Sequence, residues 1–136
     1  MAEYILVVDD DQDIAQVVKV TLESKAFEVE VAYDGKQALA SAKKRKPDAI
    51  VLDLMMPKMS GIQVLNALKA DNTTREIPVL MLTAATKYSQ KPDTYWKEKV
   101  GVDDYVSNPF EPMELLARVE NLVKQKKAKS MKPTKE

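Results

Sequence analysis

Apolar residues recur along the chain with two periods, one typical of β-strands and one typical of amphipathic helices. The segment YILVV at residues 4–8 is unbroken by polar residues, as in a strand covered on both faces. Apolar residues at helical spacing then predict a helix from residue 13 with one buried face. The residues of that face are Ile14, Val17, Val18, Leu22 and Ala26. Residues 27–33, FEVEVAY, alternate between apolar and polar positions, which predicts a strand with one exposed face near a sheet edge.

The rest of the chain continues this succession of helices and strands. We expect helices at residues 35–46, 62–71 and 111–125, and strands at residues 49–54, 79–83 and 104–107. For residues 84–102 we expect a polar loop, followed by a short helix at 93–99 that carries Tyr95 and Trp96. Strands and helices that alternate five times indicate a parallel sheet with helices on both faces. We therefore expect one α/β domain over residues 1–123.

The end of the chain differs in composition from this domain. Residues 124–136 hold six lysines and one glutamate without an apolar period, so we expect a mobile tail or the stub of a linker. The chain has 21 basic and 21 acidic residues in total, so residues 1–123 hold 15 basic and 20 acidic ones. A body with this net negative charge is not expected to contact nucleic acid directly.

The residue types that the chain lacks restrict its chemistry. Without cysteine there is no disulfide, thiol nucleophile or cysteine-held metal, and without histidine there is no Ser-His-Asp triad, histidine metal ligand or phosphohistidine. With three glycines, neither a G-x-G-x-x-G motif nor a Walker loop can be formed. No apolar run is long enough to cross a bilayer, and the first residues turn acidic where a secretory signal would stay apolar. We therefore expect a cytoplasmic protein that does not enter a membrane.

Polar side chains follow the expected strands at one edge of the sheet, where parallel α/β sheets form their functional crevice. They are Asp9 and Asp10 after the first strand, Asp53 on the third, Thr83 on the fourth, and Ser107 and Asn108 on the fifth. Asp53 stands in the apolar run AIVLDLMMP, where an isolated carboxylate costs several kcal/mol unless its charge is compensated. The sequence therefore predicts that Asp53 has charged partners.

Carboxylates that meet at one edge need a cation. Two of them ~5 Å apart repel by about 3 kcal/mol at an effective dielectric near 20. A hard divalent ion, Mg²⁺ or Mn²⁺, relieves this repulsion, and Mg²⁺ suits a site with few carboxylates, a backbone carbonyl and retained waters. The ion also neutralises an incoming phosphoryl group, so that one carboxylate can attack phosphorus and the hydroxyl of Thr83 can bond the new phosphoryl oxygen. The alternative for the acids at 9–13 is that they only cap a helix.

Four segments, ILVVDDDQD, IVLDLMMPKMSG, VLMLTA and DYVSNPF, resemble in order and spacing the signature segments of the response-regulator receiver domain of two-component signalling. The resemblance covers residues 4–123. It implies a CheY-like, flavodoxin-like (βα)5 fold with strand order 2-1-3-4-5. It also implies a signalling switch, and no enzyme beyond its own phosphorylation and dephosphorylation, with a histidine kinase or phosphotransfer protein as the donor.

The resemblance assigns a phosphorylation site and a metal site. Asp53 is implied as the phosphoacceptor. Asp9, Asp10 and Asp53, together with the backbone carbonyl of Met55, are implied as the protein ligands of Mg²⁺.

The resemblance also implies a switch at the same edge. The hydroxyl of Thr83 moves toward the phosphoryl group, and the ring of Tyr105 turns inward behind it. The small Ala84, together with Met55, keeps the phosphoryl site accessible. An effector of unknown identity is expected at the face formed by the fourth helix, the fifth strand and the last helix. A further expected partner is a second copy of the chain, in a homodimer.

One position departs from the family. Asn108 stands directly before Pro109, where the family has a lysine whose charged hydrogen bond to the phosphoryl oxygen is about twice as strong as that of a neutral amide. We therefore expect ion binding, but less efficient phosphorylation or less complete switching. Lys87 or Lys91 is a candidate substitute for the missing lysine. The family's cis bond is expected between Asn108 and Pro109.

Two other functions remain as alternatives. One is a pseudo-receiver, a protein-interaction module that keeps the fold and signals without phosphate; Asn108 favours it, and the presence of Asp10, Asp53 and Thr83 opposes it. The other is a phosphohydrolase of the haloacid dehalogenase type, which also attacks phosphorus with an aspartate after a buried strand. That chemistry needs a second acid two residues further on, where this chain has Met55.

Overall fold

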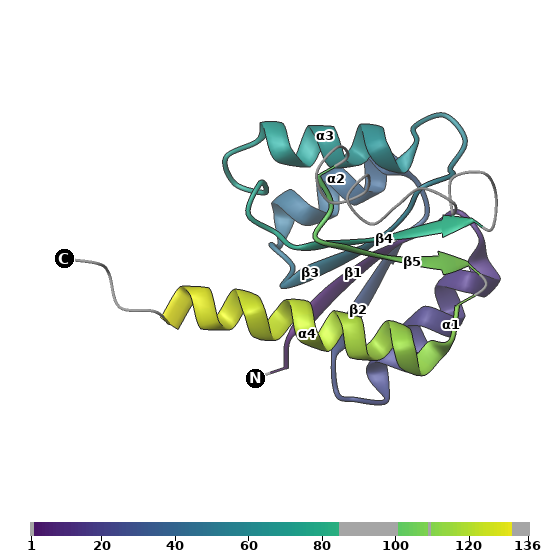
Figure 1. Cartoon of the computed structure of the whole chain (residues 1–136). Coiled ribbons are helices and arrows are strands. Elements are labelled where there is room, and N and C mark those ends of the chain that lie inside the picture. Colours follow the sequence, from purple (N-terminus) through teal and green to yellow (C-terminus); the bar gives the residue numbers. More distant parts are fainter. Residues whose placement is uncertain (1, 85–100, 109, 132–136) are drawn as a thin grey trace.

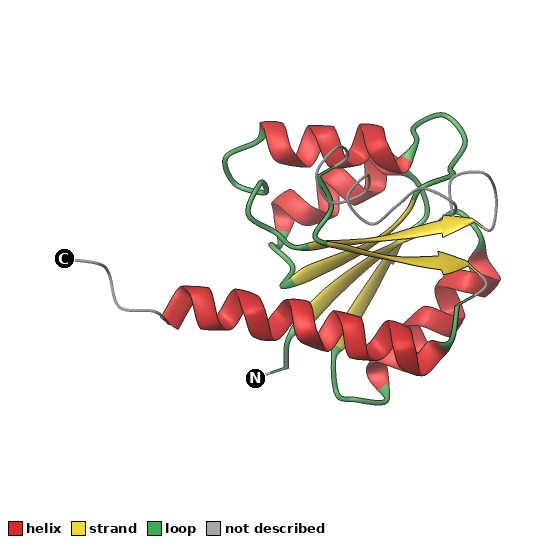
Figure 2. Ribbon diagram, viewed as in Figure 1, coloured by secondary structure: helices red, strands yellow, loops and turns green. Residues whose placement is uncertain are grey.

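The structure, a computed structural model, describes residues 2–84, 101–108 and 110–131, without the side chains of residues 84, 108 and 129–131. Five parallel strands form one sheet in the order β2-β1-β3-β4-β5 (Figures 1 and 2). They are β1 (Tyr4–Val8), β2 (Glu28–Ala32), β3 (Ala49–Asp53), β4 (Val79–Ala84) and β5 (Asp104–Asn108). The predicted sheet order is confirmed, and β2 is an edge strand with exposed glutamates.

The described residues form four helices, two on each face of the sheet (Figure 1). They are α1 (Gln12–Glu23), α2 (Gly35–Lys44), α3 (Gly61–Ala70) and α4 (Pro112–Met131). Alternate side chains of β1 serve the two layers: Leu6 and Val8 pack with α2 and α3, and Ile5 and Val7 pack with α1 and α4. Both faces of the central strands are therefore buried, which explains their unbroken apolar sequences.

The buried face of α1 differs from the predicted one. Val17 is 47% exposed, and Ala15 takes its place beside Val18 and Leu22 in the core. Ala26 would continue the predicted face, but α1 ends at Glu23 and Ala26 adopts a positive φ of 66° in the turn that follows. Apolar spacing thus gave the helix correctly, but two of its five predicted core positions were wrong.

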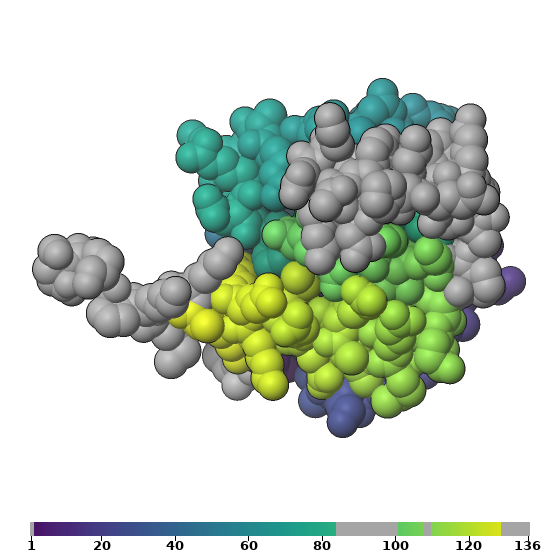
Figure 3. All heavy atoms as spheres, viewed as in Figure 1, coloured from purple at the N-terminus to yellow at the C-terminus, as the bar shows by residue number. Residues whose placement is uncertain are grey.

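The last helix extends beyond the predicted end at residue 125. α4 continues through Met131, so residues 124–131 are helical (Figure 1). Lysine is a good helix former, and basic residues are favourable near a helix carboxyl end. Lys127 also bonds Glu3, which ties the helix to the chain start. In Figure 3 the yellow atoms, which belong to the last part of α4, lie at the lower left of the coloured atoms.

Several predictions from the sequence fall outside the described residues. These are the short helix at 93–99 with Tyr95 and Trp96, the substitute lysines Lys87 and Lys91, and the peptide bond before Pro109. Among the helices that the structure describes, none has the length and apolar character to span a membrane.

Candidate functional site

Two neighbouring strands bring three carboxylates together at the carboxyl edge of the sheet. β1 and β3 pair so that Val8 lies opposite Leu52. Asp9 and Asp10 follow directly after β1, and Asp53 is the last residue of β3. One carboxylate oxygen from each of the three lies within 4.8 Å of the others. The predicted convergence of Asp9, Asp10 and Asp53 is therefore present.

Hydrogen bonds in the segment after β1 separate the capping acid from the site acids. Asp11 is the N-cap of α1, and its carboxylate accepts hydrogen bonds from the backbone N–H groups of Asp13 and Ile14. Asp9 accepts one backbone N–H bond, from Asp11 at 2.9 Å, and its own N–H donates to Ala32. Helix capping thus accounts for Asp11, but it does not account for the position of Asp9 and Asp10.

The environment of Asp53 disfavours its ionised form. Burial, followed by the charge of Asp9, raises the pKa of Asp53 to about 7, although a hydrogen bond from the Met55 N–H at 3.2 Å opposes the shift. Burial also raises the pKa of Asp9, whose residue is only 2% exposed. Without a cation, Asp53 therefore keeps its proton at pH values where ordinary aspartates have lost theirs.

The cluster fits a hard divalent cation. The three carboxylate oxygens lie within 4.8 Å of one another, so that a single ion placed between them would be within reach of all three. All three are carboxylates, the type of ligand that such ions prefer, and Asp10 is exposed, so the site opens to solvent. Asp9, Asp10 and Asp53 are therefore the residues able to hold the ion.

The next strand places a buried hydroxyl at the same edge. Thr83 follows Leu82, the β4 residue that pairs with Asp53, and it is fully buried. Its Oγ1 has no hydrogen-bond partner among the described residues. An unpaired buried hydroxyl costs about 1–3 kcal/mol, which makes Thr83 available to a ligand that enters the site.

The sequence matches one family along most of its length. Residues 5–120 match the family described as "Response regulator receiver domain". The chain belongs to this family. The carboxylate cluster and Thr83 lie at the strand ends, where the sequence motifs place them.

Curated relatives and solved structures agree with this assignment. The DNA-binding response regulator MtrA of Mycolicibacterium smegmatis is 43% identical over 119 residues, which cover 88% of this chain and 50% of MtrA. The phosphate regulon transcriptional regulatory protein PhoB of Pseudomonas aeruginosa is 41% identical over 120 residues, covering 88% of this chain and 51% of PhoB. The receiver domain thus spans about half the length of these relatives.

Among solved structures, chemotaxis protein CheY4 of Vibrio cholerae aligns with a TM-score of 0.80 and 34% identity over 90% of this chain and 99% of CheY4. The receiver domain of a Francisella response regulator aligns with a TM-score of 0.80 and 37% identity over 91% of this chain and 98% of its own. The fold is therefore that of CheY-like receivers.

Thr83 and Tyr105 of the receiver domain lie on the same face of the sheet. Tyr105 pairs with Met81 and Ser107 pairs with Thr83, so alternation along the strands turns Met81, Thr83 and Tyr105 to one side. Tyr105 is half-buried against the core layer of α2 and α3. The two residues predicted as the switch pair thus share one environment.

The remaining predicted site residues are placed less completely. Met55 follows Asp53 by two positions and is 52% exposed. Ala84 and Asn108 pair with each other at the ends of β4 and β5, but their side chains are not described. The backbone of Asn108 therefore reaches the predicted edge of the sheet, and its contacts stay a prediction.

Gly61 packs against the backbone at the end of β3, a role that the sequence pattern did not indicate. A Cβ atom at this position would lie 2.3 Å from the carbonyl oxygen of Asp53 and 2.8 Å from the Cα of Leu54. The Gly61 N–H donates to the carbonyl of Leu54 at 2.9 Å, and Ser60 caps α3 by a capping box with Gln63. The signal in the sequence was a serine cap followed at once by glycine, which lets α3 start against the backbone of Asp53.

Proposed function

We propose that this receiver domain is a phosphoacceptor switch of a two-component phosphorelay, with Asp53 as the residue that is phosphorylated. The observation that carries the proposal is the convergence of three carboxylate oxygens within 4.8 Å at the ends of β1 and β3. Such a cluster is costly without a cation, and one of its members can act as a nucleophile once a cation neutralises the others.

Asp53 supplies the nucleophile in the proposed reaction. A carboxylate oxygen of Asp53 attacks the phosphorus of a phosphohistidine, the P–N bond breaks, and an acyl phosphate forms on Asp53. The phosphohistidine of the donor, a histidine kinase or a phosphotransfer protein, lies outside these 136 residues, because they include no histidine. The proposed activity is limited to phosphorylation and dephosphorylation of the chain itself.

Asp9 and Asp10 hold the divalent ion in this proposal, with Asp53 and the backbone carbonyl of Met55 as further ligands. When bound, Mg²⁺ supplies charge neutralisation for the phosphoryl oxygens. Asp9 is oriented for this role by the hydrogen bond that one of its oxygens accepts from the Asp11 N–H. The exposed Asp10 gives the ion access from solvent.

Thr83 and Tyr105 form the proposed switch. Phosphorylation gives the unpaired hydroxyl of Thr83 an acceptor, and its movement changes the space available to Tyr105 on the same face of the sheet. Tyr105 follows Asp104, which is bonded to Arg118 of α4 at 2.8 Å. The proposed output surface comprises β5, α4 and the segment 93–99, for which the sequence predicts a short helix and which lies outside the described residues. It is the proposed surface for an effector or a second copy of the chain.

Asn108 is proposed to weaken the response. A neutral amide gives the phosphoryl oxygen about half the hydrogen-bond strength of an ammonium group. Asn108→Lys is therefore expected to raise the extent of phosphorylation of Asp53 and to tighten binding of a phosphate analogue with Mg²⁺. If the substitution changes neither property, the proposed weakness is wrong.

Asn108 also supports a second candidate, a pseudo-receiver that binds partners without phosphorylation. The two candidates are separated by incubation with acetyl phosphate and Mg²⁺, followed by intact-protein mass spectrometry. The switch predicts the mass increment of one phosphoryl group, lost in Asp53→Asn and without Mg²⁺. The pseudo-receiver predicts an unchanged mass in every sample, which would rule out the switch.

The composition of the chain also bears on the location of the switch and on its contact with nucleic acid. We propose a cytoplasmic receiver domain that does not itself contact nucleic acid, since its body carries more acidic than basic residues. A matching test is electrophoretic mobility of DNA with the isolated receiver domain, for which no shift is expected at physiological salt.

A further inference from the structure

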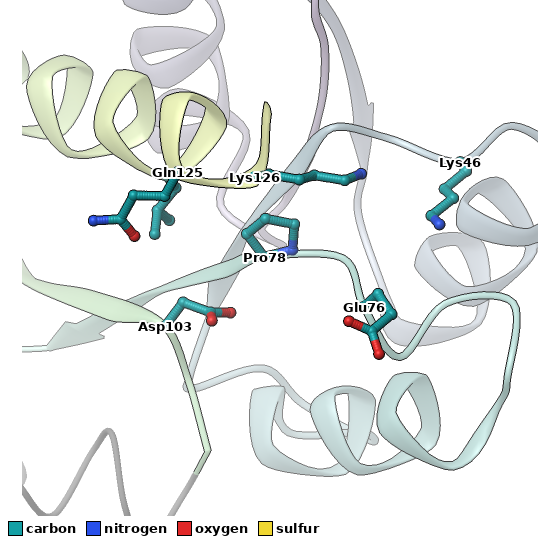
Figure 4. A pocket seen from close by; sticks show the side chains of 7 residues that line it. Lys46, Glu76, Pro78, Asp103, Gln125 and Lys126 are labelled. Carbon is teal, nitrogen blue, oxygen red and sulfur yellow. The ribbon is translucent and has the colours of Figure 1, made fainter. Parts of the chain in front are cut away.

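A cavity lies at the amino-terminal edge of the sheet, at the opposite end of the strands from Asp53. Its volume is about 280 Å³, and its lining comes from the segments before β3, β4 and β5 and from the end of α4 (Figure 4). The polar and imino residues of the lining are Lys46, Glu76, Pro78, Asp103, Gln125 and Lys126. Leu122 adds an apolar side chain.

The charges around the cavity are divided between two sides. In Figure 4 the side chain of Lys126 lies above Pro78 and that of Lys46 to its right, and the carboxylates of Glu76 and Asp103 lie below it. In the described part of the chain, none of these four groups forms an ion pair. Asp103 is held in place because one of its oxygens accepts the Val79 N–H at 2.8 Å.

The two lysines repel one another across one wall. Lys126 is half-buried, and burial followed by the charge of Lys46 lowers the pKa of Lys126, although Asp48 opposes this shift. Lys127, the next residue of α4, is instead paired with Glu3. A carboxylate placed between Lys46 and Lys126 would relieve a repulsion that no described side chain neutralises by an ion pair.

We propose that this cavity binds a small zwitterion of the amino acid class. Lys46 and Lys126 hold the carboxylate of the ligand, Glu76 and Asp103 hold its ammonium group, and Pro78 contacts its carbon chain. A simple anion would leave the two acids uncompensated, and a simple cation would leave the two lysines uncompensated. The volume is slightly below the roughly 300–1,000 Å³ of pockets for drug-sized ligands, which restricts the ligand to a small molecule. The proposal is independent of phosphorylation at Asp53.

The test is a titration of the isotope-labelled chain followed by backbone amide chemical shifts. The probes are ω-amino acids of increasing length, from glycine through γ-aminobutyrate to ε-aminocaproate, with acetate and methylammonium as single-charge probes. We expect saturable shifts confined to the lining segments and a dissociation constant of about 1 mM for the best length. Acetate and methylammonium are expected to bind at least about tenfold more weakly, a difference of about 1.4 kcal/mol.

Variants assign the binding to the cavity. Lys126→Met keeps the aliphatic stem of the side chain and removes its charge, and Glu76→Gln removes one acid; each is expected to weaken the best probe about tenfold or more. The matched control is Lys124→Met, on the same helix and outside the lining, which is expected to leave binding unchanged. Urea unfolding of each variant verifies that it is folded.

Three results would overturn the proposal. The first is the absence of saturable shifts for every probe with the folded wild-type chain. The second is equal binding of acetate and the best amino acid, which would identify a simple anion site. The third is equal affinity of Lys126→Met and Lys124→Met, which would place the binding elsewhere.

Discussion

Replacement of Asp53 by asparagine is expected to stabilise the metal-free protein at high pH. Asparagine keeps the size of the side chain and removes one of three charges whose oxygens lie within 4.8 Å. At an effective dielectric near 20, two full charges at that distance repel by about 3.5 kcal/mol. Burial of Asp53 and this repulsion together raise the pKa of Asp53 from 3.8 to about 7.

The sign of the pH dependence follows from this shift. Folded Asp53 keeps its proton between about pH 4 and pH 7, whereas unfolded Asp53 loses it, so wild-type stability falls as the pH rises through that range. The unscreened shift corresponds to about 4 kcal/mol, and partial exposure of Asp53 to solvent reduces the expected effect to about 1–2 kcal/mol. Asp53→Asn is therefore expected to unfold at higher urea near pH 8, with a difference that shrinks toward pH 4.

Urea unfolding followed by circular dichroism, with EDTA and at several pH values, measures this difference. Glu23→Gln, at the exposed end of α1, is the matched control and is expected to change stability by less than about 0.5 kcal/mol. Added Mg²⁺ is expected to stabilise the wild-type chain more than Asp53→Asn, because the variant lacks a ligand. If Asp53→Asn is no more stable than wild type at pH 8, the three carboxylates do not repel one another as described.

Other substitutions test neighbouring parts of the site by the same unfolding measurement. Thr83→Val is expected to retain or raise stability by up to about 1 kcal/mol, because it removes a buried unpaired hydroxyl, and a clear loss of stability would show that Oγ1 has a partner. Gly61→Ala is expected to lose about 1–3 kcal/mol, because its Cβ would overlap the backbone of Asp53, and wild-type stability would contradict that contact. Asp11→Ala is expected to lose about 1 kcal/mol with the α1 cap, and an unchanged stability would reassign the capping role.

The sequence predicted the carboxylate cluster because its residues lie at strand ends, where the local pattern and the position in the sheet coincide. Asp53 interrupts an otherwise apolar strand, and Asp9 and Asp10 follow another, so sheet order alone brings them together. Sequence pattern did not separate Asp11 from its neighbours. Asp9, Asp10 and Asp11 are all aspartates. Only the hydrogen bonds that Asp11 accepts from the backbone N–H groups of Asp13 and Ile14 identify it as the cap.

Features that depend on contacts between distant segments were less predictable. Val17 has the apolar character of a core residue, but the rotation of α1 against the sheet exposes it. In the part of α4 that extends beyond the prediction, Lys127 forms an ion pair with Glu3, which is far from it in the sequence. Gly61 is required because of a close approach to Asp53; the serine cap before it marks the start of α3 but not this contact.

Chemical trapping of the modified residue tests the central claim most directly. Borohydride reduces an aspartyl phosphate to homoserine, so the chain is treated with acetyl phosphate and Mg²⁺, reduced, digested and sequenced by mass spectrometry. We predict homoserine at position 53 and nowhere else, with none formed when Mg²⁺ is replaced by EDTA. An unmodified Asp53 in the Mg²⁺ sample, or homoserine at Asp9 or Asp10 instead, would contradict the account.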